Sequence, residues 1–198
     1  MTTGARRGPP SEVRIIGGQW KRTKLAVLDR PGLRPTPDRV RETLFNWLGQ
    51  DLSGWRCLDA FAGTGALGFE AASRGAAEVV MLERDAALQR ELRQVQQRLK
   101  AAQVRIEGAD ALAWMARAEA ARFELVFLDP PFDARLFETA LVAARHLPVE
   151  GGFIYLEADV AWPADALAGL GLRLFRHARA GAVHAHLLQR PSGPSGES

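Results

Sequence analysis

From residue 56 onward, short apolar runs alternate with stretches of helical periodicity, and this alternation constrains the fold more than any other feature. Strands are predicted at 56–59, 78–83, 104–107, 123–128 and 152–157, and helices at 66–74, 86–100, 110–118, 134–146 and 163–169. Such alternation is typical of βαβ units, which form a parallel sheet covered by helices on both faces. The runs at 79–82 and 125–128 are apolar at every position, as central parallel strands are. The sequence therefore predicts an α/β fold with a mostly parallel sheet.

Two antiparallel hairpins are predicted on either side of this alternation. Runs at 171–175 and 183–188 indicate a hairpin that closes the sheet. Near the other end, β-prone runs at 13–16 and 25–28 flank Gly17-Gly18 and a basic stretch. This second hairpin is expected to carry basic side chains outward.

A helix is predicted to follow the N-terminal hairpin. Thr36 is expected to be its N-cap, with Pro37 at the first helical position and Asp38 in the first turn. An apolar stripe with helical spacing follows at Val40, Leu44, Trp47 and Leu48. The stripe predicts that this helix packs on the rest of the protein.

The net charge of +3 is unevenly distributed along the chain. Residues 1–48 carry a net charge of +6 and the remainder carries −3. A basic segment joined to a mildly acidic body is typical of proteins that bind a polyanion, although it also occurs where charges only solvate an exposed segment. We expect a disordered basic N-terminus at 1–12, an extension made of the hairpin and the helix at 13–50, a main α/β domain at 51–190 and a disordered tail at 191–198.

Several classes of protein are not expected. No apolar run approaches the roughly 20 residues that cross a bilayer, and the N-terminus lacks the apolar core of a secretory signal. The protein is therefore expected to be cytoplasmic, without a membrane partner. Cys57 is the single cysteine and is expected to be a buried strand residue. His184 and His186 have no evident third ligand, so no metal site is expected.

A glycine loop follows the first strand of the alternation. Gly63, Gly65 and Gly68 have the GxGxxG spacing between a strand and a helix, and Glu83 closes the next strand. Glycines let a ligand approach the backbone, and the carboxylate can accept both hydroxyls of a ribose. The pattern fits two cofactors, a nicotinamide dinucleotide and S-adenosylmethionine.

Asp59, at the end of the first strand, favours S-adenosylmethionine. A pyrophosphate bound at the helix N-terminus would be repelled by a carboxylate a few residues upstream. S-adenosylmethionine instead carries an ammonium and a sulfonium, which an aspartate attracts. The alternative is that Asp59 only caps the turn. Asp110, after the third strand, is placed to meet an adenine amino group, to cap the next helix, or to do both.

The fourth strand ends in Asp129-Pro130-Pro131-Phe132. Ligands bind at the carboxyl ends of parallel strands, so this loop is expected beside the glycine loop. Asp129 can accept one N–H of an exocyclic amine, the carbonyl of Pro130 can accept the other, and Phe132 can stack on the base. Two such acceptors orient a weakly nucleophilic amine for attack on a methyl group. The alternative is that the loop only ends the strand.

These two motifs together resemble the S-adenosylmethionine-dependent amino-methyltransferases that act on adenine N6, cytosine N4 or guanine N2. Two N-terminal blocks, RIIGGQWK at 14–21 and RPTPDRVRETLFNWL at 34–48, closely resemble the bacterial RsmD family, which methylates guanine N2 in small-subunit ribosomal RNA. The resemblance covers residues 14–189. It implies a class I methyltransferase fold, with a Rossmann-like, seven-stranded, mostly parallel sheet and an N-terminal β-hairpin extension.

The resemblance also implies a cofactor, a partner and site residues. S-adenosylmethionine would be bound by Asp59, Phe61, Gly63, Thr64, Gly65, Glu83, Asp110 and Ala111. The guanine would be held by Asp129, Pro130 and Phe132. The implied partner is 16S rRNA in the 30S subunit or in a late assembly intermediate, on which the chain acts as a monomer.

Basic side chains of the N-terminal extension are expected to form a phosphate-binding rim beside the active site. They are Arg14, Lys21, Arg22, Lys24, Arg34, Arg39 and Arg41. Glu42 or Asn46 is expected to face the cofactor or the guanine, unless the helix uses an Arg-Glu pair at its surface. Trp20 either stacks on RNA or covers the core.

Three other functions stay open. A nicotinamide-dependent oxidoreductase would use the glycine loop but would leave the Asp129-Pro130-Pro131-Phe132 loop without a role. An adenine-N6 or DNA-directed methyltransferase would use both motifs, since the loop recognises an amino group rather than one base. An RNA-binding assembly factor would have lost catalysis, against which the intact Asp129 argues.

Overall fold

The computed structural model describes residues 12–28, 36–131 and 136–193. Its strands are β1 (Glu12–Arg14), β2 (Lys24–Ala26), β3 (Arg56–Asp59), β4 (Glu78–Glu83), β5 (Val104–Gly108), β6 (Phe123–Leu128), β7 (Pro148–Ala158), β8 (Arg173–Ala180) and β9 (Val183–Gln189). Its helices are α1 (Asp38–Leu48), α2 (Ala66–Ser73), α3 (Ala86–Leu99), α4 (Ala111–Met115), α5 (Leu136–Ala144) and α6 (Ala164–Gly169).

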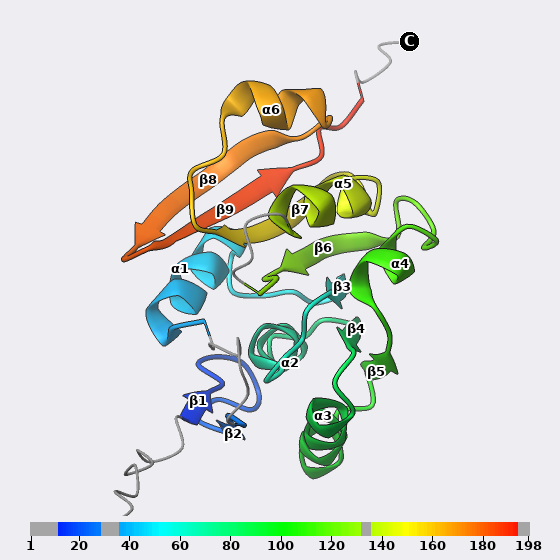
Figure 1. The fold of residues 1–198 in the computed structure, drawn as a ribbon. Coiled ribbons are helices and arrows are strands. Elements are labelled where there is room, and N and C mark those ends of the chain that lie inside the picture. Colours follow the sequence, from blue (N-terminus) through cyan, green and yellow to red (C-terminus); the bar gives the residue numbers. More distant parts are fainter. Residues whose placement is uncertain (1–11, 29–35, 132–135, 194–198) are drawn as a thin grey trace, which may run out of the picture.

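A seven-stranded sheet with the order β5-β4-β3-β6-β7-β9-β8 forms the centre of the molecule (Figure 1). Strands β3 to β7 pair in parallel, whereas β9 is antiparallel to both β7 and β8. Strands β1 and β2 form a separate antiparallel pair. The predicted mostly parallel sheet, its closing hairpin and the N-terminal hairpin are therefore confirmed.

Helices cover the sheet on both faces because its central strands are apolar on both sides. Met81 and Phe127 pack in one core with α1, α2 and α3. Their neighbours Val80 and Val126 point the other way and pack with α4, α5 and α6. Cys57 is fully buried in the first of these cores, as predicted.

Two strands are longer than the sequence pattern predicts. Strand β7 begins at Pro148, which pairs with Phe123 before an irregularity in the register. Strand β8 continues to Ala180, although residues 176–180 show no apolar alternation. This strand is one of the two edge strands of the sheet and is exposed along most of its length, so it needs no apolar face.

The start of α1 differs from the prediction. The helix begins at Asp38, its N-cap residue is Pro37, and no side chain caps it. The prediction of Thr36 as the N-cap is therefore wrong. The hydroxyl of Thr36 points instead to the end of β6, where it donates a hydrogen bond of 3.1 Å to Asp129.

Glu70 of α2 joins the N-terminal extension to the sheet. Its buried carboxylate accepts hydrogen bonds of 2.8 Å from the backbone N–H groups of Ile16 and Gly17. It also forms ion pairs with Arg41, at 3.3 Å, and with Arg74, at 2.9 Å. Every oxygen of this buried charge therefore has a partner, and the extension packs against the same core as α2.

Over the described ranges, none of the helices combines the length and the hydropathy needed to cross a bilayer.

Candidate active site

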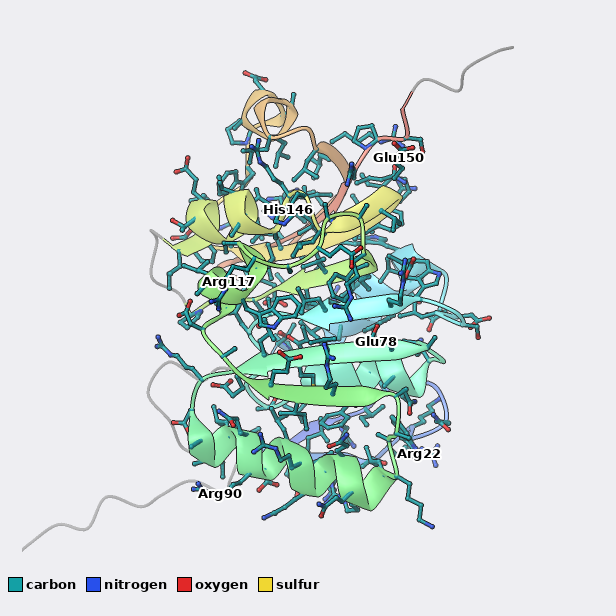
Figure 2. All side chains as sticks on the ribbon, turned by 90° about the vertical axis from the view of Figure 1, so that its right-hand side faces the viewer. Arg22, Glu78, Arg90, Arg117, His146 and Glu150 are labelled. Carbon is teal, nitrogen blue, oxygen red and sulfur yellow. The ribbon has the colours of Figure 1, made fainter. Side chains whose placement is uncertain are left out.

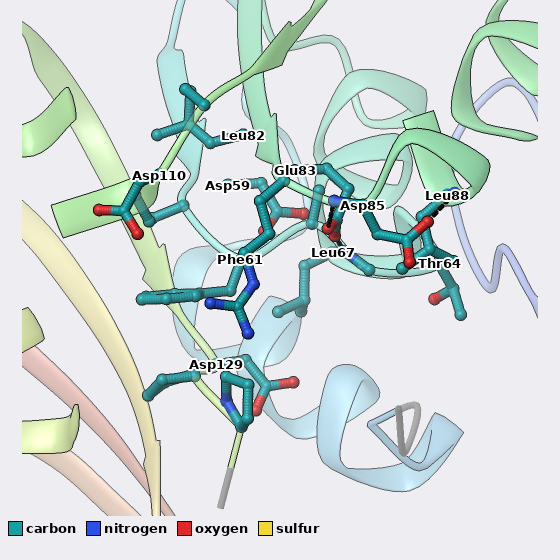
Figure 3. A pocket seen from close by; sticks show the side chains of 18 of the residues that line it. Asp59, Phe61, Thr64, Leu67, Leu82, Glu83, Asp85, Leu88, Asp110 and Asp129 are labelled. Carbon is teal, nitrogen blue, oxygen red and sulfur yellow. Dashed lines mark hydrogen bonds between the residues drawn. The ribbon is translucent and has the colours of Figure 1, made fainter. Parts of the chain in front are cut away.

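A cavity of about 380 Å³ lies at the carboxyl ends of β3, β4, β5 and β6 (Figure 3). Each of these strands ends beside a carboxylate that lines the cavity: Asp59, Glu83, Asp110 and Asp129. In Figure 3 the first three lie on one side of Phe61 and Asp129 lies on the other. The structure thus brings the glycine loop and the Asp129-Pro130 loop to one cavity, of a size typical of small-molecule sites.

The three glycines of the loop have different structural roles. Gly63 and Thr64 line the cavity, whereas Gly65 is not among the lining residues. Gly65 has a φ of +77°, and a Cβ there would lie 2.6 Å from the side chain of Leu92. A Cβ on Gly68 would lie 2.4 Å from the side chain of Met81. Gly65 therefore shapes the turn from behind, and Gly68 lets α2 approach the sheet closely.

Asp59 lines the cavity and also accepts a hydrogen bond from the glycine loop, at Gly68. Its carboxylate is 2% exposed, and the bond from the N–H of Gly68 is 3.0 Å long. Burial, and then the nearby charge of Glu83, raise the pKa of Asp59 to about 7. A cation in the cavity would favour the ionised carboxylate, so the group suits a positively charged ligand.

Glu83 and Asp110 are held in fixed positions by backbone N–H groups. Glu83 accepts hydrogen bonds from Gly63, at 3.0 Å, and from Asp85, at 2.8 Å. Asp110 is the N-cap of α4 and accepts from the N–H of Ala113 at 2.9 Å. Each carboxylate oxygen has a second lone pair, so both groups can still accept a hydrogen bond from a ligand.

The remaining residues predicted to bind the cofactor, Phe61 and Ala111, also line the cavity.

Asp129 is half-buried at the end of β6 and accepts the hydrogen bond from Thr36 described above. Burial, and next the charge of Glu157, raise the pKa of Asp129 well above its usual value, while the bond from Thr36 acts in the opposite direction. Pro130 lines the cavity beside it. Phe132, the third residue expected to hold the guanine, lies outside the described residues.

Sequence reasoning missed two side chains behind Asp129. Glu157 of β7 is 2% exposed and accepts a hydrogen bond of 2.8 Å from the hydroxyl of Tyr155. Leu128 pairs with Leu156 in the parallel register, so Asp129 and Glu157 are the next residues along two neighbouring strands. The signal was a carboxylate at the end of the strand next to β6, which becomes informative only when the strand order is known.

Arg41 does not belong to a phosphate-binding rim. Its side chain is fully buried, and its guanidinium contacts Asp38, Glu70 and the backbone oxygens of Arg14 and Thr36. This prediction is therefore corrected: the charge that sequence analysis assigned to RNA is used inside the protein. Helical spacing cannot distinguish the two uses of an arginine.

Lys21 and Arg22 are exposed, but they do not lie beside the active site as expected. The preceding residues Gln19 and Trp20 bond to Ser73, the last residue of α2, at 2.8 and 2.9 Å. Helix α2 begins at the cavity, by the carboxyl ends of the parallel strands, and ends on the side where these strands begin. Figure 2 accordingly shows Arg22 toward the same side as Glu78, the first residue of β4.

The other basic candidates differ in their surroundings. Arg39 is exposed in the first turn of α1, three positions after Thr36. Arg14 is exposed on β1, and Lys24 forms a 2.8 Å ion pair with Glu12. Arg34 lies outside the described residues. Among the described basic candidates, Arg39 is the nearest in sequence to Thr36, which lines the cavity, but Arg39 is not itself a lining residue.

Three further candidates on the N-terminal extension lie away from the cavity. Glu42 and Asn46 are exposed, neither lines the cavity, and Asn46 accepts a hydrogen bond from the side chain of Gln50. Trp20 is half-buried and packs against the core.

The structure adds a third histidine to the pair found in the sequence. His177 of β8 pairs in register with His186, and its Nε2 lies 3.0 Å from Nδ1 of His184. Nε2 of His186 accepts a hydrogen bond of 3.1 Å from the N–H of Trp162. Within the described part of the chain, no three side chains are arranged to hold a metal ion.

The strand order, the glycine loop after β3 and the acidic side chains after the next strands define a class I methyltransferase fold. The family model described as "Conserved hypothetical protein 95" matches residues 13–189. "Ribosomal RNA small subunit methyltransferase D" of Escherichia coli K12 is 41% identical over 189 residues, covering 94% of this chain and 93% of that protein. The chain therefore belongs to this family, the RsmD family that its N-terminal blocks resemble.

Solved structures agree with this assignment. "Putative methyltransferase yhhF" from Escherichia coli has a TM-score of 0.79 and 36% identity, covering 92% of this chain and 100% of that one. A methylase structure from Haemophilus influenzae, described as putative, has a TM-score of 0.75 and 35% identity, with the same coverage.

Proposed function

We propose that this protein transfers a methyl group from S-adenosylmethionine to the exocyclic N2 amine of a guanine in 16S rRNA. The observation that carries the proposal is that one cavity is lined both by Asp129 and Pro130 and by the carboxylates Asp59, Glu83 and Asp110. The relative named as a small-subunit ribosomal RNA methyltransferase supports the class of substrate.

The cofactor side of the cavity suits S-adenosylmethionine, which supplies an electrophilic methyl group on a sulfonium. Asp59 faces its cationic part, Glu83 accepts from the ribose hydroxyls, and Asp110 accepts from the adenine amino group. Phe61 and Ala111 supply apolar contacts. A pyrophosphate at the start of α2 would lie among the carboxylates Asp59, Glu83 and Asp110, which argues against a nicotinamide dinucleotide.

Asp129 and Pro130 orient the amine. The carboxylate of Asp129 accepts one N–H, and the carbonyl of Pro130 accepts the other, which directs the nitrogen lone pair away from the ring plane. The N–H proton becomes acidic only as the new N–C bond forms. Asp129 therefore acts mainly by orientation and by stabilising positive charge on the nitrogen, and it need not be a strong base.

The partner is 16S rRNA in the 30S subunit or in a late assembly intermediate, met by a cytoplasmic monomer. Arg39, which is exposed in the first turn of α1, would contact a phosphate next to the splayed-out guanine. Lys21 and Arg22 lie at the end of α2 that is far from the cavity. Because a helix of 8 residues is about 12 Å long, the two residues lie roughly that far from the cavity end of α2. RNA that contacts both places must follow the extension from one edge of the sheet to the other, as a large folded RNA can.

The test is methyl transfer from labelled S-adenosylmethionine to unmethylated 30S subunits, naked 16S rRNA, tRNA and duplex DNA in parallel. Nucleoside analysis should give N2-methylguanosine confined to small-subunit RNA. Methyladenine, or label in DNA alone, would overturn the proposed substrate. In a separate measurement, S-adenosylhomocysteine but not NADH should raise the unfolding temperature.

A further inference from the structure

Two acidic side chains and one hydroxyl meet behind the wall of the cavity. The hydroxyl of Thr36 donates to Oδ2 of Asp129 at 3.1 Å. Burial raises the pKa of Glu157, whereas the hydroxyls of Tyr155 and Thr36 act to lower it. The strand register places Asp129 and Glu157 side by side at the ends of β6 and β7. Thr36 and Asp129 line the cavity, whereas Glu157 lies behind them.

The number of hydrogen-bond donors limits how many of the two carboxyl groups, Asp129 and Glu157, can be ionised at once. A threonine hydroxyl donates only one hydrogen bond, so it can serve one of two ionised carboxylates but not both. Tyr155 serves the far oxygen of Glu157 at 2.8 Å. If one proton is added to Glu157, the carboxyl donates to the Thr36 oxygen and the Thr36 hydroxyl donates to Asp129. One proton on Glu157 would therefore complete a continuous chain of hydrogen bonds. Without that proton, two neighbouring negative charges would face each other.

The charged groups around this chain do not remove the need for the proton. Against the effect of burial, the cation Arg41 of α1 acts to lower the pKa of Glu157, but Glu70 and Asp38 already pair with this arginine. Asp59, at the end of β3, adds a further negative charge near Asp129. Tyr155 is neutral, and burial raises the pKa of its hydroxyl well above the usual value.

We propose that Glu157 is a positioning residue for methyl transfer, which shares one proton with Asp129 through the hydroxyl of Thr36. This inference rests on the proposed function and extends it. In the active form Glu157 is neutral, Thr36 is oriented toward Asp129, and Asp129 carries the negative charge that accepts the amine N–H.

The transfer step balances with this assignment. The S–CH₃ bond breaks with its electron pair left on sulfur, and the nitrogen lone pair forms the N–CH₃ bond. The N–H proton passes from the amine to the carboxylate of Asp129 and then to solvent through the open cavity. The shared proton stays on Glu157, so the chain is ready for the next turnover.

The first test is the pH profile of kcat for the wild type and for Glu157→Gln. The glutamine amide can donate to Thr36 and accept from Tyr155, as the neutral carboxyl does, but it cannot lose a proton in the working range. The wild type should lose kcat on the alkaline side, where the shared proton dissociates. Glu157→Gln should lose this alkaline limb and keep the acidic limb due to Asp129. An alkaline limb that is unchanged in Glu157→Gln overturns the proposal.

The second test removes the bridge. Thr36→Val, which is close to isosteric, should lower kcat about ten- to a hundredfold, as expected when a hydrogen bond to a charged group is lost. Thr36→Ser should restore most of that loss, because serine supplies the same hydroxyl. Affinity for S-adenosylhomocysteine serves as the check that the cavity is intact. Equal rates for the valine and serine variants overturn the proposal, and this test remains decisive if Glu157→Gln does not fold.

A third readout does not depend on activity. Asp129 and Glu157 both have raised pKa values and so bind more protons in the folded than in the unfolded state. The unfolding temperature of the wild type should therefore fall as pH rises from about 5 to about 8. Glu157→Gln should show a shallower fall, and equal slopes overturn the proposal. If the wild type methylates no RNA but the slopes differ as stated, the proposed function fails while the shared proton stands.

Discussion

The hydroxyl of Thr36 donates a hydrogen bond to the carboxylate of Asp129 across 93 positions of the sequence. Thr36 is held in turn by Arg41, whose guanidinium donates to its backbone oxygen at 3.4 Å and pairs with the buried Glu70. The N-terminal extension therefore forms part of the wall of the cavity, through Thr36.

Arg41 should be required for stability in a way that its neighbour on the same helix is not. Arg41→Leu leaves the charge of Glu70 only partly compensated, and removing one partner of a buried ion pair costs about 3–5 kcal/mol of the free energy of unfolding. Arg39→Leu, at an exposed position, should change it by about 0.5 kcal/mol or less. Urea unfolding of both variants measures the difference. Similar losses in the two would show that Arg41 does not have the buried role described.

Asp59 should make cofactor binding depend on pH. Its pKa is about 7 in the folded protein and is lower when the chain is unfolded, so its contribution to stability falls as pH rises through 7. A cation beside it needs the ionised form. The affinity for S-adenosylmethionine should therefore rise with pH up to about 7 and then level off.

The matched variant is Asp59→Asn, in which the side-chain oxygen can still accept from Gly68. Calorimetric titration across the same pH range should show weaker binding with this rise removed. The same pH dependence in the variant would assign the effect to another group.

Gly65 should tolerate no side chain. Gly65→Ala combines a positive φ with overlap against Leu92 and Phe69, and strain of this kind costs about 1–3 kcal/mol. Gly169→Ala is the control, because a Cβ there meets nothing within 4 Å. Thermal unfolding should show a clear loss for the first and little change for the second. Unchanged stability of Gly65→Ala would mean that the loop adopts another conformation.

The salt dependence of RNA binding should separate the basic residues by position. Replacing a residue that contacts a phosphate lowers the slope of log affinity against log salt by about one. Arg39→Ala should do so, and the Lys21→Ala/Arg22→Ala double variant should lower the slope by about two, because the proposed path of the RNA reaches the far end of α2. Arg145→Ala, at an exposed site on the other face of the sheet, serves as the control. A full slope in Arg39→Ala would remove this residue from the interface.

The sequence was sufficient to predict the features set by local pattern. Apolar runs and helical periodicity gave the order of strands and helices, and parallel strands place their carboxyl ends at one edge, which brought Asp59, Glu83, Asp110 and Asp129 together. Asp110 was expected to cap the next helix or to meet a ligand, and it both caps α4 and lines the cavity.

Features set by tertiary packing were not predictable in this way. Arg39 and Arg41 differ by two positions on one helix, yet one is exposed and the other is buried, because only one faces Glu70. The same holds for Lys21 and Arg22, which the docking of the hairpin on Ser73 places away from the cavity. Thr36 fits the pattern of an N-cap, but the approach of β6 gives its hydroxyl a better-placed acceptor.

The central claim is that Asp129 accepts the amine of a guanine in a site whose cofactor half is independent of it. The most direct measurement is single-turnover methyl transfer to small-subunit RNA by the wild type and by Asp129→Ala, with the affinity for S-adenosylhomocysteine measured on the same preparations. The account predicts that Asp129→Ala forms no detectable N2-methylguanosine while its affinity for the cofactor product stays within a few-fold of the wild type. Methyl transfer that persists in Asp129→Ala, or cofactor binding that disappears with it, would contradict the account.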